Sequence, residues 1–226
     1  MDTYKILVIG DIHGHGSWKS ICEKEKDADK IIFLGDYFDS FHIPSEDQKD
    51  NFLNILEFKH NHPKCILLLG NHDYHYIYNT SYSGYSYITK SLAQPLITKA
   101  IQDGDLNIIH IHDNIVFSHA GISEFWLNKV AQLTDIHDIT FDKIKLSVLD
   151  WNGLYGCNPY GDTISNSPIW IRPKSLNDNK LKGYIQVVGH TPSRKIIEHD
   201  GIWICDALPN EYLTIVNKEF KINDNR

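Results

Sequence analysis

The chain has 226 residues, of which 42% are hydrophobic and 23% charged, and its 22 basic and 29 acidic side chains give a formal charge of −7. This composition excludes a largely disordered chain, because the apolar fraction is that of ordinary globular proteins. The acidic balance argues against general nucleic-acid binding. The longest apolar runs, near Ile31 and Cys65, are far shorter than the roughly 20 residues that a membrane-spanning helix requires.

The amino terminus shows no basic segment followed by an apolar stretch and a cleavage site. The four cysteines are scattered along the chain without a CxxC pair. These features favour a cytoplasmic protein with reduced thiols. Because no repeat, low-complexity tract or linker interrupts the chain, we expect one domain over residues 1–226.

Short β-branched and aliphatic runs predict the strands of the fold. In chain order these runs cover residues 4–10, 30–35, 64–70, 107–112, 114–119, 184–189, 195–199, 202–206 and 212–217.

Helices are expected between these runs, each recognised by a capping or terminating residue. In chain order they are a helix capped by Ser17, one with a Ser45–Gln48 capping box that ends at Pro63, one with Pro95 in its first turn that stops near Gly104, one capped by Ser123, and one from Thr140 through Leu149, ended by Gly153. The first half therefore alternates strand and helix, while the last third consists mostly of hairpins. This order is typical of a layered α/β sandwich with a mixed sheet.

Five of the expected strands end in glycine or another small residue and are followed at once by polar side chains. The segments are Gly10-Asp11-Ile12-His13, Gly35-Asp36-Tyr37-Phe38-Asp39, Gly70-Asn71-His72-Asp73, Ser118-His119-Ala120 and Gly189-His190-Thr191. Because the carboxyl ends of parallel strands converge on one crevice of an α/β sheet, we expect these side chains to lie close together.

The residue types at these strand ends indicate a metal centre. Carboxylates, imidazoles and an amide oxygen, with no thiolate, suit Mn²⁺, Fe or Zn²⁺. Three carboxylates in one cleft, those of Asp11, Asp36 and Asp39, would repel one another without a cation. Two divalent ions roughly 3.5–4 Å apart remove that repulsion and form a clamp suited to phosphoryl transfer.

The segments GDIHGH, GDYFD, GNHD, HAG and GHT, in this order, resemble the motifs of the calcineurin-like metallophosphoesterases. Within them the chain is similar to the phosphoprotein-phosphatase branch, which includes small bacterial and phage phosphatases and symmetrical diadenosine tetraphosphatases. The resemblance extends from residue 5 to about residue 215. It implies a layered α/β/β/α sandwich with two mixed sheets.

The resemblance also implies a role for each matched residue. Asp11 and His13 would bind the first metal ion, Asp36 would bridge both ions, and the second would be completed by Asn71, His119 and His190. Asn71 would also contact the substrate phosphate. His72 would be the general acid that protonates the leaving group, with Asp39 orienting it. The implied reaction is attack on phosphorus by a hydroxide that bridges the two ions, with Mn²⁺ as the favoured metal.

Two positions depart from the family's pattern. Ser40 stands where the family usually has a phosphate-binding arginine, and Asp73 stands where glutamate is usual. A second phosphate-binding arginine of this branch is matched by Arg172, in the segment Trp170-Ile171-Arg172. Arg172 is therefore the expected phosphate clamp, since its fork of donors suits a phosphate.

The expected activity is hydrolysis of a phosphomonoester carried by a phosphoprotein or a small molecule, with no membrane partner. Two alternatives stay open. One is hydrolysis of a dinucleoside polyphosphate, in which the tyrosine-rich segment 74–87 would stack a base. The other is a metal-binding scaffold without activity. Ser40, which stands in place of the usual phosphate-binding arginine, keeps this alternative open. The plainer interpretation of the tyrosines is that they pack over the sheet edge.

Overall fold

The computed structural model describes residues 4–78, 80–150 and 156–225. Its strands form two mixed sheets. One contains β1 (Lys5–Ile9), β2 (Lys30–Phe33), β3 (Cys65–Leu68), β4 (Leu106–Asn107), β10 (Glu211–Val216) and β11 (Glu219–Asp224). The other contains β5 (Ile109–His112), β6 (Ile115–Ser118), β7 (Ile185–Val188), β8 (Ile197–His199) and β9 (Ile202–Ile204). The strand orders are β11-β10-β1-β2-β3-β4 and β5-β6-β7-β9-β8.

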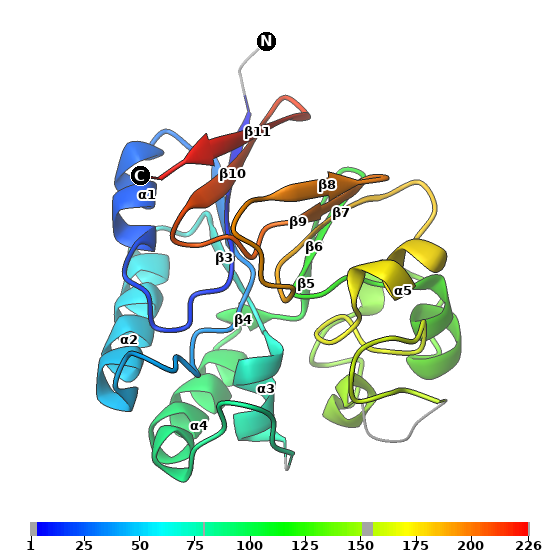
Figure 1. The fold of residues 1–226 in the computed structure, drawn as a ribbon, viewed down its shortest axis with the longest axis horizontal. Coiled ribbons are helices and arrows are strands. Elements are labelled where there is room, and N and C mark those ends of the chain that lie inside the picture. The colour runs from blue at the N-terminus through cyan, green and yellow to red at the C-terminus, as the bar shows by residue number, and fades with distance from the viewer. Residues whose placement is uncertain (1–3, 79, 151–155, 226) are drawn as a thin grey trace.

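Helices cover the outer faces of the two sheets. The helices are α1 (Trp18–Lys24), α2 (Ser45–Asn61), α3 (Asn71–Ile77), α4 (Tyr87–Gln102) and α5 (Pro173–Asp178), with shorter helical turns at Trp126–Val130, Ile136–Asp138 and Leu146–Leu149. Figure 1 shows α1 and α2 against the six-stranded sheet and α5 beside the five-stranded one. This arrangement confirms the expected α/β/β/α sandwich with two mixed sheets.

The alternation of side chains along β1 explains the layers. Leu7 packs on the outer side in a cluster that includes Phe52 of α2, whereas Val8 packs with Phe117 of the five-stranded sheet. Successive residues of a strand point to opposite faces, so a strand that is apolar throughout is covered on both sides. On the far side, Leu176 of α5 packs against residues of β7 and β9.

One strand prediction needs correction, and one strand of the structure is not predicted. The run 107–112 is divided between the sheets: Leu106–Asn107 pairs with β3, Ile109–His112 pairs with β6, and the chain passes between the sheets at the buried Ile108. The sequence does not predict β11, because its residues are mostly exposed and polar. The turn before it is formed by Asn217 and Lys218, which both have positive φ. Asparagine adopts this conformation more readily than most residues, so Asn217 is the available signal in the sequence.

Helices α2 and α4 lie in the regions where the sequence predicts helices, but their first residues or caps differ from the prediction. α4 begins at Tyr87, where Ser86 Oγ accepts the backbone N–H groups of Ile88 and Thr89, so Pro95 lies inside the helix and not in its first turn. α2 begins at Ser45 but without the capping box, because the Ser45 hydroxyl bonds Thr89 and the Gln48 amide donates to the Ile43 carbonyl.

Three further helix predictions have different outcomes. α1 follows Ser17 directly, but no side-chain hydrogen bond caps it. The cap at Ser123 is present, because the Trp126 N–H donates to Ser123 Oγ at 2.9 Å. The helix expected from Thr140 through Leu149 is wrong, since only Leu146–Leu149 is helical there, as a short 3₁₀ turn. Its expected end at Gly153 lies outside the described residues.

In the described part of the chain, no helix has the length and apolarity to cross a bilayer.

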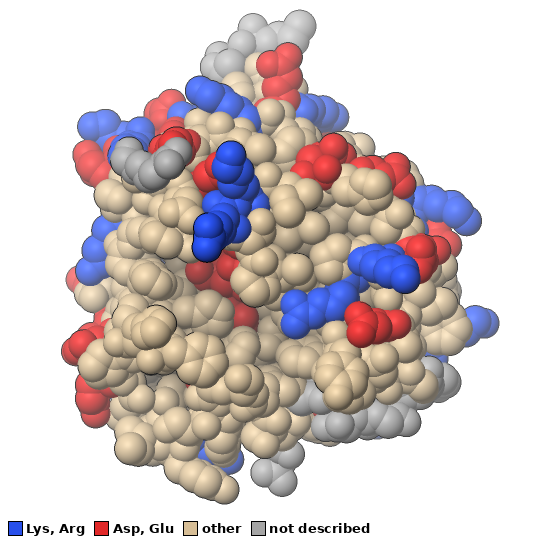
Figure 2. Space-filling view, in the orientation of Figure 1, with Lys and Arg blue, Asp and Glu red and all other residues tan. Residues whose placement is uncertain are grey.

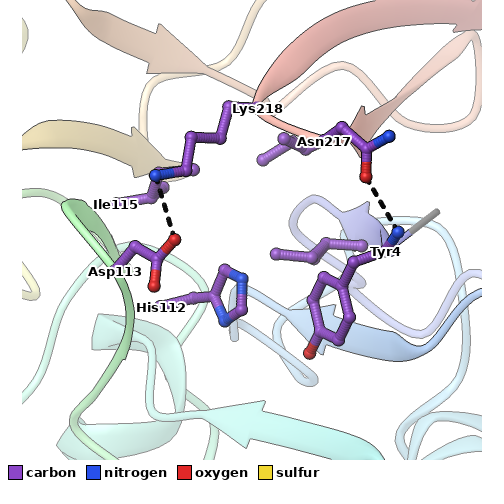
Figure 3. Close-up of a pocket in the computed structure, with 8 residues that line it drawn as sticks. Tyr4, His112, Asp113, Ile115, Asn217 and Lys218 are labelled. Carbon is purple, nitrogen blue, oxygen red and sulfur yellow. Dashed lines mark hydrogen bonds and ion pairs between the residues drawn. The ribbon is translucent and has the colours of Figure 1, made fainter. Parts of the chain in front are cut away.

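A cavity of about 350 Å³ lies where the two sheets meet at the amino-terminal end of β1. The Tyr4 ring stacks on His112 with 4.6 Å between centroids. Lys218 Nζ lies 3.1 Å from Asp113 Oδ2, which joins a turn of one sheet to a turn of the other (Figure 3). This seam is at the opposite end of β1 from the polar residues that follow the strand.

Candidate metal centre

The polar residues that follow β1, β2, β3, β6 and β7 meet at one cavity of about 410 Å³. The residues of the sequence prediction that line it are Asp11, His13, Asp36, Asp39, Asn71, His72, Arg172 and His190. His119 is fully buried beside them. In Figure 2 a depression near the middle of the face exposes acidic atoms, with basic side chains beside it. The structure therefore brings together every site residue that the sequence singled out.

The candidate ligand atoms form one continuous group. Asp36 Oδ2 lies 3.3 Å from His119 Nε2 and 3.7 Å from His13 Nε2. Asn71 Oδ1 lies 2.9 Å from His119 Nε2 and 2.7 Å from His190 Nδ1. Atoms of Asp11, Asp36 and His119 all lie within 4.8 Å of one another. Six side chains thus present oxygen and nitrogen atoms to the same small volume.

Backbone carbonyls orient two of the imidazoles. His13 Nδ1 lies 2.7 Å from the Phe38 carbonyl oxygen, and His119 Nδ1 lies 2.8 Å from that of Leu34. A carbonyl oxygen can only accept, so Nδ1 of each ring is the donor to it, and Nε2 is the nitrogen that faces the candidate centre. This is the usual way in which a protein presents a histidine to a metal ion.

The loops that carry the site adopt unusual backbone conformations. His13, Asp36, Asp39 and His190 have φ angles of 40°, 53°, 66° and 63°. Residues other than glycine rarely adopt this left-handed region, and each such residue costs on the order of 1 kcal/mol or more. Such strain persists only where the surrounding contacts hold the chain in place.

Glycines next to the ligands allow the loops to approach one another. A Cβ atom at Gly70 would collide with the Asp36 carboxylate, and one at Gly189 would collide with the carboxylate of Asp11. The carboxylates therefore occupy space that only a glycine leaves open. The glycines that precede Asn71 and His190 are steric requirements of the site.

The negative charges of the buried carboxylates in this group require cations to balance them. Burial, then the carboxylates of Asp206 and Asp36, raise the pKa of Asp11 well above its ordinary value. Crowded buried carboxylates beside imidazoles fit divalent metal ions, and oxygen and nitrogen donors without a thiol fit Mn²⁺, Fe or Zn²⁺.

Asp206 is a site residue that the sequence prediction does not include. It lines the cavity and follows β9 after one intervening residue, Cys205. β9 runs parallel to β7, so its carboxyl end reaches the same edge as His190. The expected strand 202–206 ends on this aspartate, and that position is the available signal.

His72 and Asp39 form a close pair at the edge of the centre. His72 Nδ1 lies 2.7 Å from Asp39 Oδ2. Burial acts to lower the pKa of His72, but the carboxylates of Asp36 and Asp39 outweigh it and raise the pKa above its ordinary value. The pair is therefore arranged to keep a proton on the His72 ring.

Arg172 is the only lysine or arginine among the described residues that line the cavity. Its Nη1 donates to the His190 carbonyl at 2.9 Å and to Thr191 Oγ1 at 3.2 Å. These bonds fix the guanidinium against the loop that carries His190. The remaining N–H groups have no hydrogen-bond partner within the described part of the chain.

The two departures from the family's pattern have local structural roles. Ser40 Oγ accepts the backbone N–H groups of His42 and Ile43, at 3.3 and 3.2 Å, so it shapes a turn at the rim of the cavity. The Asp73 carboxylate accepts the N–H groups of Asp36, Tyr37 and Gly70 at 2.8 to 2.9 Å. Asp73 thereby ties the loop after β2 to the loop after β3.

The tyrosine-rich segment is mostly structural. Tyr74 and Tyr76 are buried in α3, and Tyr87 is exposed. Tyr82 differs, because it lines the cavity and stacks on Trp170 with 4.4 Å between ring centroids. The packing interpretation therefore holds for the helix, while Tyr82 forms an aromatic wall.

Comparison with known proteins agrees with this geometry. The model of the calcineurin-like phosphoesterase family matches residues 4–206, and the chain belongs to this family. It is accordingly a metal-dependent hydrolase of phosphoesters. A search of the curated proteins found no match.

Solved structures share the fold. The chain superposes on a cold-active protein-tyrosine phosphatase of a psychrophilic Shewanella species with a TM-score of 0.66 and 17% identity, over 98% of this chain and 78% of that one. A second structure of a cold-active protein tyrosine phosphatase gives 0.64 and 18%, over 98% and 76%. Likeness at this identity concerns the fold alone.

Proposed function

We propose that the chain is a phosphomonoesterase that works with two divalent cations, Mn²⁺ being the favoured metal, on a phosphoprotein or a small phosphorylated molecule. The observation that carries the proposal is the meeting of six candidate ligands and the His72–Asp39 pair at one cavity. A cavity that combines a metal clamp with a proton donor has the parts that phosphate ester hydrolysis requires.

The ligands divide between two cation positions. Asp11 and His13 would hold one ion, Asp36 would bridge, and the second would be held by Asn71, His119 and His190. Asp206, beside Asp11, adds negative charge near the first cation position. When bound, the two ions supply the positive charge that attracts phosphate oxygens and makes a water molecule nucleophilic at neutral pH.

The remaining roles fall to side chains of the chain itself. Arg172 binds the phosphate oxygens through the N–H groups that it does not use in the protein, and Asn71, which lines the same cavity, also contacts the phosphate. Because Asp39 engages Nδ1 of His72, Nε2 is the atom that passes a proton to the oxygen of the leaving group. Such proton transfer lowers the barrier most for leaving groups that are poor as anions.

The lining favours a monoester over a dinucleoside polyphosphate. A polyphosphate chain brings several negative charges, and Arg172 is the one lysine or arginine that lines the described cavity. The protein-tyrosine phosphatases of similar fold support a phosphoprotein as one candidate substrate. Tyr82 would pack against an aromatic leaving group.

The test compares three substrates: p-nitrophenyl phosphate, bis-p-nitrophenyl phosphate and diadenosine tetraphosphate, all with Mn²⁺-loaded protein. We expect turnover of the monoester and a loss of at least about 100-fold in Asn71→Ala, because a candidate metal ligand is removed. Asn128→Ala, at an exposed asparagine outside the site, is the matched control and should keep full activity.

Preference for the diester or for the nucleotide would contradict the proposal in favour of a different phosphoesterase. If the metal-loaded protein hydrolyses none of the three substrates, the result would instead support a scaffold without activity.

A further inference from the structure

The Asp39 carboxylate is held by more groups than His72. Its side chain has no exposed surface, and Oδ2 lies 2.7 Å from both His72 Nδ1 and His75 Nε2. The other oxygen, Oδ1, accepts a hydrogen bond from the Tyr76 hydroxyl. His72, His75 and Tyr76 are at positions i, i+3 and i+4 of α3, which lie on one face of a helix. One turn of α3 therefore presents three groups to a single carboxylate.

Aromatic packing fixes the His75 ring. The ring is fully buried, stacks on Tyr82 at 5.2 Å between centroids, and meets Tyr76 and Tyr85 edge-on at 4.2 and 5.2 Å. A ring enclosed on several sides cannot turn its nitrogen away from the carboxylate. The cage therefore gives the His75 contact a defined direction.

The opposite side of Asp39 is closed by backbone. A Cβ atom at Gly84 would lie 2.9 Å from the Asp39 Cβ, so the loop after α3 passes directly against this side chain. Oδ2 is hydrogen-bonded to His72 and in close contact with His75, and Oδ1 accepts from Tyr76, so the carboxylate is held from several sides. The arrangement also favours its ionised form: burial acts to raise the pKa of Asp39, but His72 and His75 outweigh it and lower the pKa.

We propose that His75 and Tyr76 are positioning residues, which hold the Asp39 carboxylate so that it orients the His72 ring with Nε2 toward the leaving group. This inference rests on the proposed general-acid role of His72. Neither residue lines the cavity, so both act through Asp39.

The test uses two phosphomonoesters whose leaving groups differ in their need for a proton. p-Nitrophenolate departs readily without one, whereas the alkoxide of a primary alkyl phosphate requires it. In Tyr76→Phe and His75→Phe we expect kcat for the alkyl phosphate to fall about tenfold or more. The value for p-nitrophenyl phosphate should fall less than about threefold, with KM unchanged for both. Tyr76→Phe removes a single hydroxyl, so it keeps the test valid if His75→Phe folds poorly.

Two further variants separate positioning from a general structural role. His75→Gln keeps an N–H donor near the position of Nε2 and should lose less than His75→Phe. Tyr74→Phe is the matched control, because Tyr74 is a buried tyrosine of the same helix whose hydroxyl donates to the Leu146 carbonyl instead. Equal losses on both substrates, or the same split in Tyr74→Phe, would overturn the inference.

A second measurement does not depend on turnover. In protein loaded with diamagnetic Zn²⁺, the His72 Nδ1–H resonance of histidine labelled with ¹⁵N should shift or broaden in Tyr76→Phe and stay unchanged in Tyr74→Phe. An unchanged resonance in both variants would refute the positioning role. A wild-type protein that hydrolyses neither ester would refute the proposed function, while the resonance still decides whether His72 is positioned by these residues.

Discussion

Strain at single residues of the site is offset by contacts of their neighbours. Asp36 holds a left-handed φ of 53°, an unfavourable conformation for any residue with a Cβ. Its own N–H and those of Tyr37 and Gly70 all donate to the Asp73 carboxylate. Hydrogen bonds of this kind contribute about 0.5–1.5 kcal/mol each. Asp73 therefore compensates for the strain that places the bridging carboxylate.

His110, on β5, gives a residue-level prediction about pH. A histidine in an unfolded chain has a pKa near 6.5. In the fold, burial and then Lys30, whose Nζ lies 3.2 Å from the ring, lower the pKa of His110 to about 4. Between these values the unfolded state binds a proton that the folded state does not, so the free energy of unfolding falls as the pH falls through this window.

After allowance for partial solvent screening, we expect this single group to lower the free energy of unfolding by about 1 kcal/mol between pH 7 and pH 5. Urea denaturation at both pH values should show that the free energy of unfolding falls less in His110→Gln than in the wild type. His199→Gln, at an exposed histidine, is the control. Identical losses in the wild type and His110→Gln would contradict the assignment.

At the scale of elements, the site could be predicted because its residues follow strands directly. A strand end has a defined place in a sheet, so Asp11, Asp36 and Asn71 could be brought together from sequence order alone. His75 could not, because its contact with Asp39 depends on how α3 packs against the loop after β2. Such packing leaves no local pattern in the sequence.

The start of α4 shows why the ends of helices are harder to predict than their positions. Proline is common in the first turn of a helix, which predicts a start near Pro95. In the structure the helix begins eight residues earlier, at Tyr87, because Ser86 Oγ accepts the N–H groups of Ile88 and Thr89. A hydroxyl cap that satisfies two backbone donors therefore decides the start. When two local signals compete in this way, the sequence pattern alone does not rank them.

The glycine before Asn71 gives a prediction about the loop after β3. In Gly70→Ala the new Cβ would collide with the Asp36 carboxylate, which must then move. We expect at least a tenfold loss of Mn²⁺ affinity and a destabilisation of about 1–3 kcal/mol. Calorimetric titration of Mn²⁺ and chemical denaturation measure the two effects.

Gly16→Ala is the matched control, because a Cβ at Gly16 meets nothing within 4 Å. Its Mn²⁺ affinity should equal that of the wild type. Unchanged affinity in Gly70→Ala as well would show that Asp36 does not need the space at Gly70.

At the scale of the molecule, the candidate ligands come from both sheets. Asp11, Asp36 and Asn71 follow strands of the six-stranded sheet, whereas His119 and His190 follow β6 and β7 of the five-stranded one. Cations held between them would join the two layers. Metal binding and global stability are therefore expected to be coupled.

Removing the metal should lower the melting temperature of the whole protein. A ligand at 100 times its Kd stabilises the fold by about 2.7 kcal/mol, and 1 kcal/mol shifts Tm by about 2–4 °C in a chain of this size. We expect Tm to fall by about 5–10 °C when EDTA is added to Mn²⁺-loaded protein, as measured by calorimetry. In Asn71→Ala the Tm should fall by less when EDTA is added. A wild-type Tm that does not change with EDTA would argue against cations shared by the two sheets.

The stack of Tyr82 on Trp170 has a practical consequence. The indole ring of Trp170 also lies 5.3 Å from the His190 ring, measured between centroids. Its fluorescence therefore depends on the charge and mobility of the groups at the cavity. The protein carries an intrinsic optical reporter at the candidate centre, through which occupancy can be followed in solution without a label.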